Sequence, residues 1–504
     1  DRIRSRAILE QFSDRSNHAV TAAMPSIGRG QDVFFVGRER EREAIQAAFD
    51  GVQATRSART VVISGPSGIG KSSLIQQALR DIQENDAMPA AIALTVLSGR
   101  CYEWEKVSYK AMDGVIDELS TLWASLNKED AARLLPRDAH LLSVIFPVLD
   151  RVHAVSRARK HNFKEVPQAM RDHAFSAIRE TFDRLSLEHQ VVLYLDDMQW
   201  ADEDTVGLLK SLLRGPKEPA LLVVLSTRPQ GLQPGTPLSE LLAALGDAAE
   251  TIALPPLGKR DSISAARSLL GEDNEALIEK AAHEADGNPY FLTELAYSLK
   301  EKGDAAVNHG AVDDLIRERV AALPETERRL LEVLCIAGGP VGLDVARDAS
   351  EVSPATLATA TKSLRHKNLL RSASANENGS VAPYHDRVRH AICDVLPATR
   401  TLALHRGLAT ALEQQAADDP GRIVRHWLGA NEAERAATWS LRAAEVALAK
   451  LNFTRAADFF ETELLMRWSR RGAHARLPMP TRLRWRTREQ KVNRWSFGAA
   501  SPRT

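Results

Sequence analysis

Short apolar runs alternate with longer amphipathic stretches in the first half of the chain. The runs have the length of buried strands rather than helices, and they stand at residues 60–64, 91–97, 191–195, 221–226 and 251–254. A long, mainly helical insertion is predicted before the third run, over residues 107–182. Strands that alternate with helices favour a parallel sheet with helices on both faces. The pattern therefore predicts an α/β core over residues 32–257, preceded by a linker over residues 1–31.

The second half of the chain has a different pattern, because strand signals vanish from about Gly258. Helices are predicted up to residue 302, with a break at Gly287-Asn-Pro289. A helix over 354–367 is followed by strands at 369–373 and 381–384 and a polar turn between them, an order typical of a winged helix. The predicted parts are a helical lid over 258–305, a winged-helix module over 306–400, repeat-like helices over 401–465 and a disordered basic tail over 466–504.

Composition limits the class of protein. At 504 residues the chain has room for roughly two to four domains. Its formal net charge of +0 gives no overall attraction to nucleic acid or membrane, and no apolar run approaches the ~18 residues that span a bilayer. The three cysteines are far apart, which is expected of a cytoplasmic protein without disulfides. Because the first residue is Asp1, we expect further sequence before it.

The stretch from Thr60 to Leu74 carries the clearest chemical signal. An apolar strand leads into G-x-x-x-x-G-K-[ST] and then a helix start, which is the phosphate-binding loop of nucleotide-binding proteins. Lys71 would reach the β- and γ-phosphates of ATP, and Ser72 would ligate Mg²⁺. The residues predicted to surround the phosphates are Gly65, Pro66, Ser67, Gly68, Ile69, Gly70, Lys71, Ser72 and Ser73. This motif predicts ATP or ADP with Mg²⁺ as ligands.

Two carboxylates end the third predicted strand. Ligands of open α/β sheets bind beyond the carboxyl ends of the strands, where Asp196 and Asp197 would lie. Asp196 is predicted to hold Mg²⁺, and Asp197 to orient or deprotonate an attacking water. A solvated Asp pair at a strand end is the alternative. Arg228, after the fourth strand, is predicted to sense the γ-phosphate, with an ordinary surface arginine as its alternative.

The order of these motifs resembles the STAND ATPases, a signalling branch of the AAA+ group. The resemblance covers roughly residues 34–465, and within it the segments 99–103, 107–110 and 425–427 are similar to the regulatory half of large bacterial serine/threonine protein kinases. The motifs that carry it are Phe35-Val-Gly-Arg-Glu, the phosphate loop, Leu195-Asp-Asp-Met-Gln-Trp-Ala-Asp, Ser226-Thr-Arg, Leu257-Gly and Gly287-Asn-Pro-Tyr-Phe. It implies a slow ATPase that acts as a molecular switch.

The resemblance also assigns roles that spacing alone does not. Val36 and Gly37 would contact the nucleotide, Pro289 would lie against base and ribose, and His385 would hold ADP in a closed state. For His385 the alternative is a satisfied imidazole beside a helix cap, with Asp386 as the N-cap of a helix over 387–395. Ring motors of the AAA+ group carry an arginine before the fifth strand, whereas residues 229–250 contain none, which favours a switch.

The alanine-rich pair of helices over 433–465 resembles a tetratricopeptide repeat. Small residues would let the helices pack closely, and phenylalanines would fill the groove: Ala443, Ala444, Ala447, Ala456, Ala457, Phe453, Phe459 and Phe460. Because such arrays need about three repeats, we expect the repeat region to be incomplete here. The implied partner is a protein or a fused kinase domain, and a nucleotide-dependent oligomer is consistent with the family.

Three other functions remain open at the level of sequence. The same ATPase core occurs in maltose-regulator-like (LuxR-type) transcription regulators, but those carry a C-terminal helix-turn-helix that is not visible here. An origin-binding AAA+ initiator would use the winged helix to grip DNA. An interaction scaffold with an inactive nucleotide site is the third. The basic tail shows no pattern for sequence-specific DNA binding, and the chain contains no kinase signature of its own.

Overall fold

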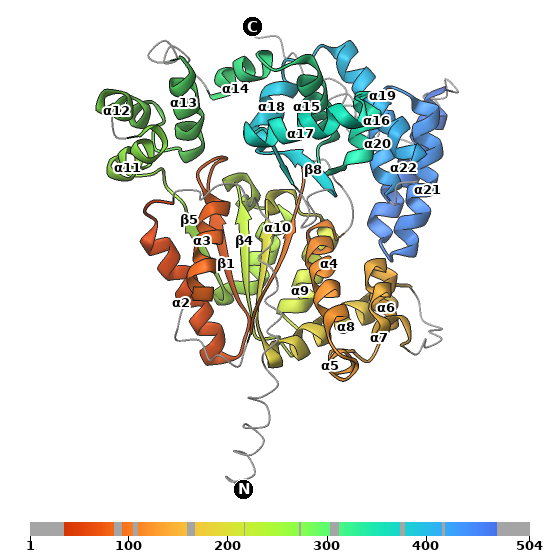
Figure 1. Cartoon of the computed structure of the whole chain (residues 1–504). Helices are drawn as coiled ribbons and strands as arrows, with labels where there is room; N and C mark the ends of the chain where they lie inside the picture. Colours follow the sequence, from red (N-terminus) through yellow and green to blue (C-terminus); the bar gives the residue numbers. More distant parts are fainter. Residues whose placement is uncertain are drawn as a thin grey trace. The chain divides into compact units, whose positions relative to one another are not determined.

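The computed structural model divides into two compact units, each described by itself (Figure 1). The first unit contains residues 35–101 and 109–256, and the second contains residues 102–103 and everything from Leu257 onward. The structure describes residues 35–84, 93–103, 109–158, 167–215, 217–271, 274–302, 312–372, 379–415 and 419–470. The predicted linker, Phe34, residues 376–378 of the polar turn and residues 471–504 of the predicted basic tail lie outside these ranges.

The first unit is built on a five-stranded parallel sheet, as predicted. Its strands are β1 (Arg59–Ser64), β2 (Ala93–Arg100), β3 (His189–Asp196), β4 (Leu221–Thr227) and β5 (Ala249–Ala253). The order across the sheet is β2-β3-β4-β1-β5, so β4 lies between the strand of the phosphate loop and the strand of the Asp pair. All residues of β4 and all but the first of β3 are buried, which means that both faces of the sheet are covered.

Helices surround this sheet and include the predicted insertion. They are α2 (Glu39–Thr55), α3 (Lys71–Glu84), α4 (Lys110–Ser125), α5 (Lys128–Arg133), α6 (His140–Ile145), α7 (His153–Ser156), α8 (Pro167–Glu188), α9 (Glu203–Leu213) and α10 (Pro237–Leu245). In its described residues the insertion, α4 to α8, consists of helices joined by short turns, and it packs through α4 on β2 and through α8 on β3. Its apolar side chains join one core with the inner residues of β3 and β4.

The second unit is mainly helical. Its helices are α11 (Lys259–Leu270), α12 (Glu275–Glu284), α13 (Pro289–Lys302), α14 (Val312–Ala321), α15 (Glu325–Ala337), α16 (Leu343–Ser350), α17 (Pro354–His366), α18 (Asp386–Cys393), α19 (Ala398–Gln414), α20 (Pro420–Gly429), α21 (Ala433–Ala449) and α22 (Phe453–Arg470). Three short strands, β6 (Val341–Gly342), β7 (Leu370–Ser372) and β8 (Ser380–Pro383), form an antiparallel sheet in the order β6-β8-β7. Sequence patterning missed β6, α16 and α20, which are short.

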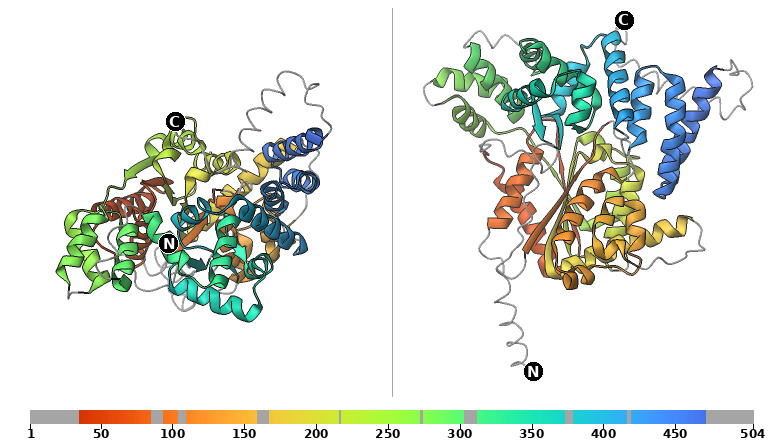
Figure 2. Two further views of the ribbon diagram at one scale, coloured as in Figure 1. Left: turned by 90° about the horizontal axis from the view of Figure 1, so that it is seen from above. Right: turned by 45° about the vertical axis from the view of Figure 1, so that its right-hand side comes forward.

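The order of α17, β7 and β8 agrees with the predicted helix followed by two strands. The assignment of this part as a winged helix remains a prediction. Helices α21 and α22 lie side by side in both figures, and the small residues between them are buried (Figure 2). Ala443, Ala444, Ala447 and Ala456 pack against Phe459 as expected. Ala457 is exposed, so its predicted place in the packing seam was wrong: α22 turns that position toward solvent.

No helix among the described residues combines the length and the apolar character needed to cross a membrane.

Candidate functional site

The predicted phosphate loop joins β1 to α3 in the first unit. Gly68 and Gly70 have φ angles of 82° and 95°, a backbone region that favours glycine. A Cβ at Gly65 would stand 2.9 Å from Ile69 Cγ2, so this position also tolerates only a minimal side chain. The buried Lys71 ammonium donates to the carbonyl oxygens of Gly65 at 2.9 Å and Pro66 at 3.0 Å. The loop therefore holds its lysine over its own backbone, at the start of a helix whose N-terminus favours anions.

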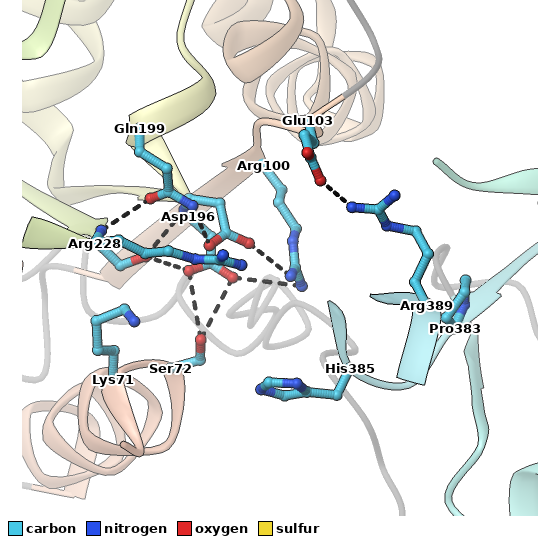
Figure 3. A network of polar contacts seen from close by, with 12 residues as sticks. Lys71, Ser72, Arg100, Glu103, Asp196, Gln199, Arg228, Pro383, His385 and Arg389 are labelled. Atoms are coloured by element: carbon cyan, nitrogen blue, oxygen red, sulfur yellow. Dashed lines mark hydrogen bonds and ion pairs between the residues drawn. The ribbon is translucent and has the colours of Figure 1, made fainter. Parts of the chain in front are cut away.

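The Asp pair lies where β3 ends (Figure 3). Asp196 is the last residue of β3, and Asp197 follows with a left-handed φ of 59°, so the two side chains diverge from one strand end. The Ser72 hydroxyl is 3.4 Å from each oxygen of the Asp196 carboxylate. These are the two residues that the sequence assigned to Mg²⁺, and the structure brings them together from α3 and β3.

Ser226 connects the two acids, a role that was not predicted from the sequence. Its hydroxyl donates to Asp196 and accepts from the backbone N–H of Asp197 at 3.0 Å. This contact exists because β4 runs between β1 and β3, with Leu195 paired to Leu225 one residue before. Only the strand order reveals Ser226, since sequence patterning does not predict which strands are neighbours.

Arg100 is a second residue that sequence reasoning missed. It ends β2 directly beside Asp196 in the sheet register. Its guanidinium lies 2.6 Å from Asp197 Oδ2 and 3.5 Å from Asp196 Oδ2. Burial tends to raise the pKa of the Asp196 carboxyl, but the charge of Arg100 and the Ser226 hydrogen bond outweigh it and lower that pKa. The Asp196 carboxylate is thus kept ionised in a buried place.

Gln199 links the Asp pair to the fourth strand. Its amide N–H donates to Asp197 Oδ1 at 2.9 Å, and its carbonyl accepts from the Arg228 backbone N–H at 3.0 Å. Arg228 therefore stands at the same edge of the sheet as Asp197, as the sequence predicted. Its role as a γ-phosphate sensor remains a prediction.

The turn before α2 places Val36 and Gly37 in the first unit. Gly37 and Arg38 both have φ angles of 69°, and the Arg38 side chain donates to the Pro255 carbonyl. The turn is thereby tied to the segment that follows β5. Its predicted contact with the nucleotide base remains a prediction.

Pro289 and His385 belong to the second unit. Pro289 is the first residue of α13, after Gly287 at φ 69°, and the Gly287 carbonyl accepts from Leu257 N–H at 2.8 Å. The His385 ring stacks on the neighbouring Tyr290 with ring centroids 4.2 Å apart and planes 15° apart. The first turn of α13 and the N-cap of α18 are therefore in contact, which was not predicted from the sequence.

The cap of α18 differs from the expectation. Asp386 is the first helical residue rather than the N-cap, so that prediction was wrong. His385 itself is the N-cap, and its Nδ1 accepts from the Arg387 N–H at 3.1 Å. The Nδ1 atom is consequently an acceptor, which leaves the ring proton on Nε2 in the neutral form. The alternative considered for His385 was an imidazole whose hydrogen bonds are satisfied beside a helix cap. The observed N-cap contact agrees with this alternative and gives His385 a role in the fold.

The described residues contain no group of three or more His, Cys, Asp or Glu side chains that would form a metal cluster. Mg²⁺ in nucleotide sites uses one or two protein oxygens and completes its shell with phosphate and water. Ser72 and Asp196 supply such a pair of oxygens, so the residues present fit a Mg²⁺–nucleotide complex.

Comparison with known proteins finds a family match over the part of the chain that contains this site. Residues 35–224 match the model of the AAA ATPase domain. A solved STAND protein with a tetratricopeptide repeat sensor from Pyrococcus horikoshii shares the fold, with a TM-score of 0.53 and 16% identity over 88% of this chain and 57% of that chain. A match to the Aeropyrum pernix ORC2 protein has a TM-score of 0.38 (14% identity, 73% of this chain, 97% of that chain), which is too low to support an argument.

Two curated proteins are also similar to this chain in sequence. A protein of Rhizobium meliloti (strain 1021) described as uncharacterized is 22% identical over 455 residues, covering 85% of this chain and 42% of that protein. A hybrid signal transduction histidine kinase G of Dictyostelium discoideum is 26% identical over 159 residues, 30% of this chain and 4% of that protein. The chain thus spans less than half the length of either curated relative.

Proposed function

We propose that this chain is a STAND-class AAA+ ATPase, a switch that binds ATP and hydrolyses it slowly. One observation carries the proposal. Side chains from three separate elements, Ser72 on α3, Asp196 on β3 and Ser226 on β4, come within hydrogen-bond distance at the carboxyl edge of the sheet. They lie next to the phosphate loop, where the γ-phosphate of ATP and its metal would have to be held.

The residues of the loop and the sheet edge divide the chemistry among them. Lys71 would move from its loop carbonyls to the β- and γ-phosphates, and Ser72 with Asp196 would hold Mg²⁺. When bound, Mg²⁺ neutralises charge that develops on the phosphate oxygens. Asp197 would orient the attacking water and accept its proton, and Gln199 fixes the direction of that carboxylate.

Slow ATP hydrolysis would follow from the ion pair between Asp197 and Arg100. A carboxylate that is 2.6 Å from a guanidinium is stabilised as an anion and is a poorer proton acceptor than an isolated one. Arg100 would therefore restrain the base until its own position changes. In addition, the described residues of the segment 229–250 supply no arginine to the γ-phosphate.

The switch itself requires contacts that differ between the ATP and ADP states. Pro289 and His385 are proposed to report the nucleotide to the second unit, and their link is the stacking of His385 on Tyr290. The helices α19 to α22 are the proposed output surface for a protein partner. A nucleotide-dependent oligomer would be one form of that output.

The Lys71→Ala variant tests the proposed nucleotide site through its affinity for ATP. Charged hydrogen bonds to phosphate contribute about 1.5–3 kcal/mol, so the affinity for a fluorescent ATP analogue should fall about 10- to 100-fold. The exposed Lys362→Ala variant in the second unit is the control and should bind like the wild type. Unchanged affinity in Lys71→Ala would instead support the scaffold with an inactive site.

A finer proposal is that the chain is the regulatory part of a larger serine/threonine protein kinase. The segments 99–103, 107–110 and 425–427 support it, because they resemble that subgroup. The coding sequence upstream of Asp1 tests it: a kinase domain there is expected, and a different catalytic or DNA-binding domain would contradict it.

The transcription-regulator and initiator alternatives predict tight binding to duplex DNA. A filter-binding measurement at low and moderate salt separates them from the switch, because phosphate contacts make DNA affinity steeply salt-dependent. We expect no such binding.

A further inference from the structure

Tyr194 of β3 shares a face of the parallel sheet with Asp196. Side chains alternate along a strand, and Leu193 and Leu195 both face the core that the sheet forms with the helical insertion. Tyr194 and Asp196 therefore face the opposite way, toward α3, which supplies Ser72. The tyrosine is 1% exposed, so its hydroxyl is enclosed by protein on this face.

The Tyr194 hydroxyl is a buried polar group without a well-formed hydrogen bond to the protein. It lies next to the Ser72 hydroxyl and the Asp196 carboxylate. It nevertheless makes no hydrogen bond of ordinary geometry with any described protein atom. Nearly all buried polar groups have a partner, because an unpaired one costs the free energy of its desolvation. The partner of this hydroxyl is therefore expected to be a bound ligand or water molecule.

The neighbouring Asp196 carboxylate has few acceptor positions left, since a carboxylate offers about four lone-pair sites. It accepts from the Ser226 hydroxyl, and both its oxygens lie 3.4 Å from the Ser72 hydroxyl (Figure 3). The Arg100 guanidinium stands 3.5 Å from one of these oxygens. The Tyr194 oxygen, in contrast, carries lone pairs that no described protein group uses. A water molecule bound here would thus find its free acceptor at Tyr194 rather than at Asp196.

We propose that Tyr194 is a positioning residue for the Mg²⁺–nucleotide complex, whose hydroxyl accepts a hydrogen bond from a water molecule of the Mg²⁺ shell beside Ser72 and Asp196. The inference rests on the proposed function, since it adds a residue to the same site. Mg²⁺ keeps several water molecules in nucleotide sites, and their hydrogens need acceptors. Tyr194 supplies one acceptor, and the water gives the hydroxyl the partner that it lacks. Tyr194 thereby contributes to the affinity for the metal–nucleotide complex and not to that for the nucleotide alone.

The Tyr194→Phe variant, which removes only the hydroxyl, tests this role. The dissociation constant of a fluorescent, non-hydrolysable ATP analogue is measured in EDTA and in Mg²⁺, and the ratio of the two values gives the contribution of the metal. Partners in the outer shell of a metal typically change its affinity about 10- to 100-fold, so the ratio should fall about tenfold in Tyr194→Phe. The dissociation constant in EDTA should equal that of the wild type. An unchanged ratio would overturn the inference.

Tyr109→Phe is the matched control for that substitution. Tyr109 is also 1% exposed, and its hydroxyl likewise makes no well-formed hydrogen bond with a described protein atom. Its ring, however, packs on Phe146 and Phe175 in the core on the other face of the sheet. Tyr109→Phe should therefore keep the wild-type ratio, and a fall equal to that in Tyr194→Phe would contradict the assignment.

Urea denaturation without nucleotide tests a purely structural role for the hydroxyl. Because phenylalanine keeps the shape of the ring and removes an unpaired group, Tyr194→Phe should unfold at the wild-type urea concentration or at a higher one. A lower midpoint would show that the hydroxyl already has a protein partner, which would overturn the inference. Equal affinities of the wild type in Mg²⁺ and in EDTA would also overturn it while leaving nucleotide binding intact. A wild-type protein that does not bind the analogue at all would instead overturn the proposed function.

Discussion

Two pairs of buried titratable side chains, one in each unit, are handled in opposite ways. Asp196 and Asp197 of the first unit are 5% and 8% exposed and stand beside the cation Arg100. His426 of the second unit is fully buried, and its Nδ1 is 2.9 Å from His405 Nδ1. Asp196 is kept charged, whereas the two imidazoles are kept neutral. A buried titratable side chain remains charged, and so available for catalysis, only where the surrounding side chains stabilise its charge.

The causes are visible around each pair. Arg100 and the Ser226 hydroxyl lower the pKa of Asp196 despite its burial. For His426, burial lowers the pKa first, and the positive charges of Arg425 and Arg422 lower it further. An Nδ1-to-Nδ1 hydrogen bond also requires that one ring donates and the other accepts, which two protonated rings cannot do. The histidine pair is therefore a structural contact between α19 and α20.

The largest effect should come from the acid pair. Asp197→Asn removes the proposed base while keeping the shape of the side chain, so kcat for ATP hydrolysis should fall roughly 10²- to 10⁴-fold, with ATP affinity nearly unchanged. Phosphate release under saturating ATP measures it. The exposed Asp247→Asn variant is the control. A kcat in Asp197→Asn within twofold of wild type would remove Asp197 from the mechanism.

A methyl group that pushes the His405 ring away from His426 should destabilise the fold without a direct effect on ATP hydrolysis. A Cβ at Gly429 would stand 2.5 Å from His405 Nδ1, so Gly429→Ala forces the ring away from His426. We expect a loss of about 1–3 kcal/mol in the free energy of unfolding, measured by urea denaturation.

Gly207→Ala in α9 is the matched control for that substitution. Its Cβ would be 4.0 Å from Phe175, an ordinary contact, and alanine is the better helix former. It should leave stability unchanged or raise it slightly. If Gly429→Ala is equally harmless, the His405–His426 contact does not stabilise the fold.

The pH dependence of stability tests the same histidine pair without a change in packing. Burial and the charge of Arg425 lower the pKa of His405 from 6.5 to about 3. Between about pH 6.5 and 3 the unfolded chain therefore binds the proton that the folded protein refuses. The free energy of unfolding should be maintained above pH 6.5 and fall below it, by at most about 1.4 kcal/mol per pH unit for each such histidine.

Urea denaturation at pH 7.5, 6 and 5 measures this slope. His405→Asn should make the slope shallower, whereas the exposed His366→Asn should keep the wild-type slope. Identical slopes in wild type and His405→Asn would show that the pair does not titrate as a buried neutral contact.

Sequence patterning was reliable where the signal is local. The five strands of the first unit were predicted close to their observed bounds because each is a continuous apolar run between turns. The phosphate loop was predicted because its glycines, lysine and serine act at fixed spacing. Short elements such as β6 and α16 were missed because two to eight residues carry too little periodicity.

The residues of the candidate site were predicted only in part, because sequence patterning reads local signals alone. Asp196 and Asp197 follow a recognisable strand, but Ser226, Gln199 and Arg100 acquire their roles from neighbours in space. Arg100 faces Asp196 because β2 pairs with β3 in a particular register. A shift of one residue in that register would turn its side chain to the other face of the sheet.

By itself the sequence determined the α/β core, the phosphate-loop motif from which a nucleotide ligand is proposed, and the acids at the end of the third strand, since these depend on local periodicity and on spacing within one loop. The tertiary structure decided which groups surround those acids: Ser226 from β4 and Arg100 from β2. It also decided that His385 caps α18 and stacks on Tyr290. The reason is that strand order and helix packing depend on contacts between residues far apart in the chain, which no local pattern encodes.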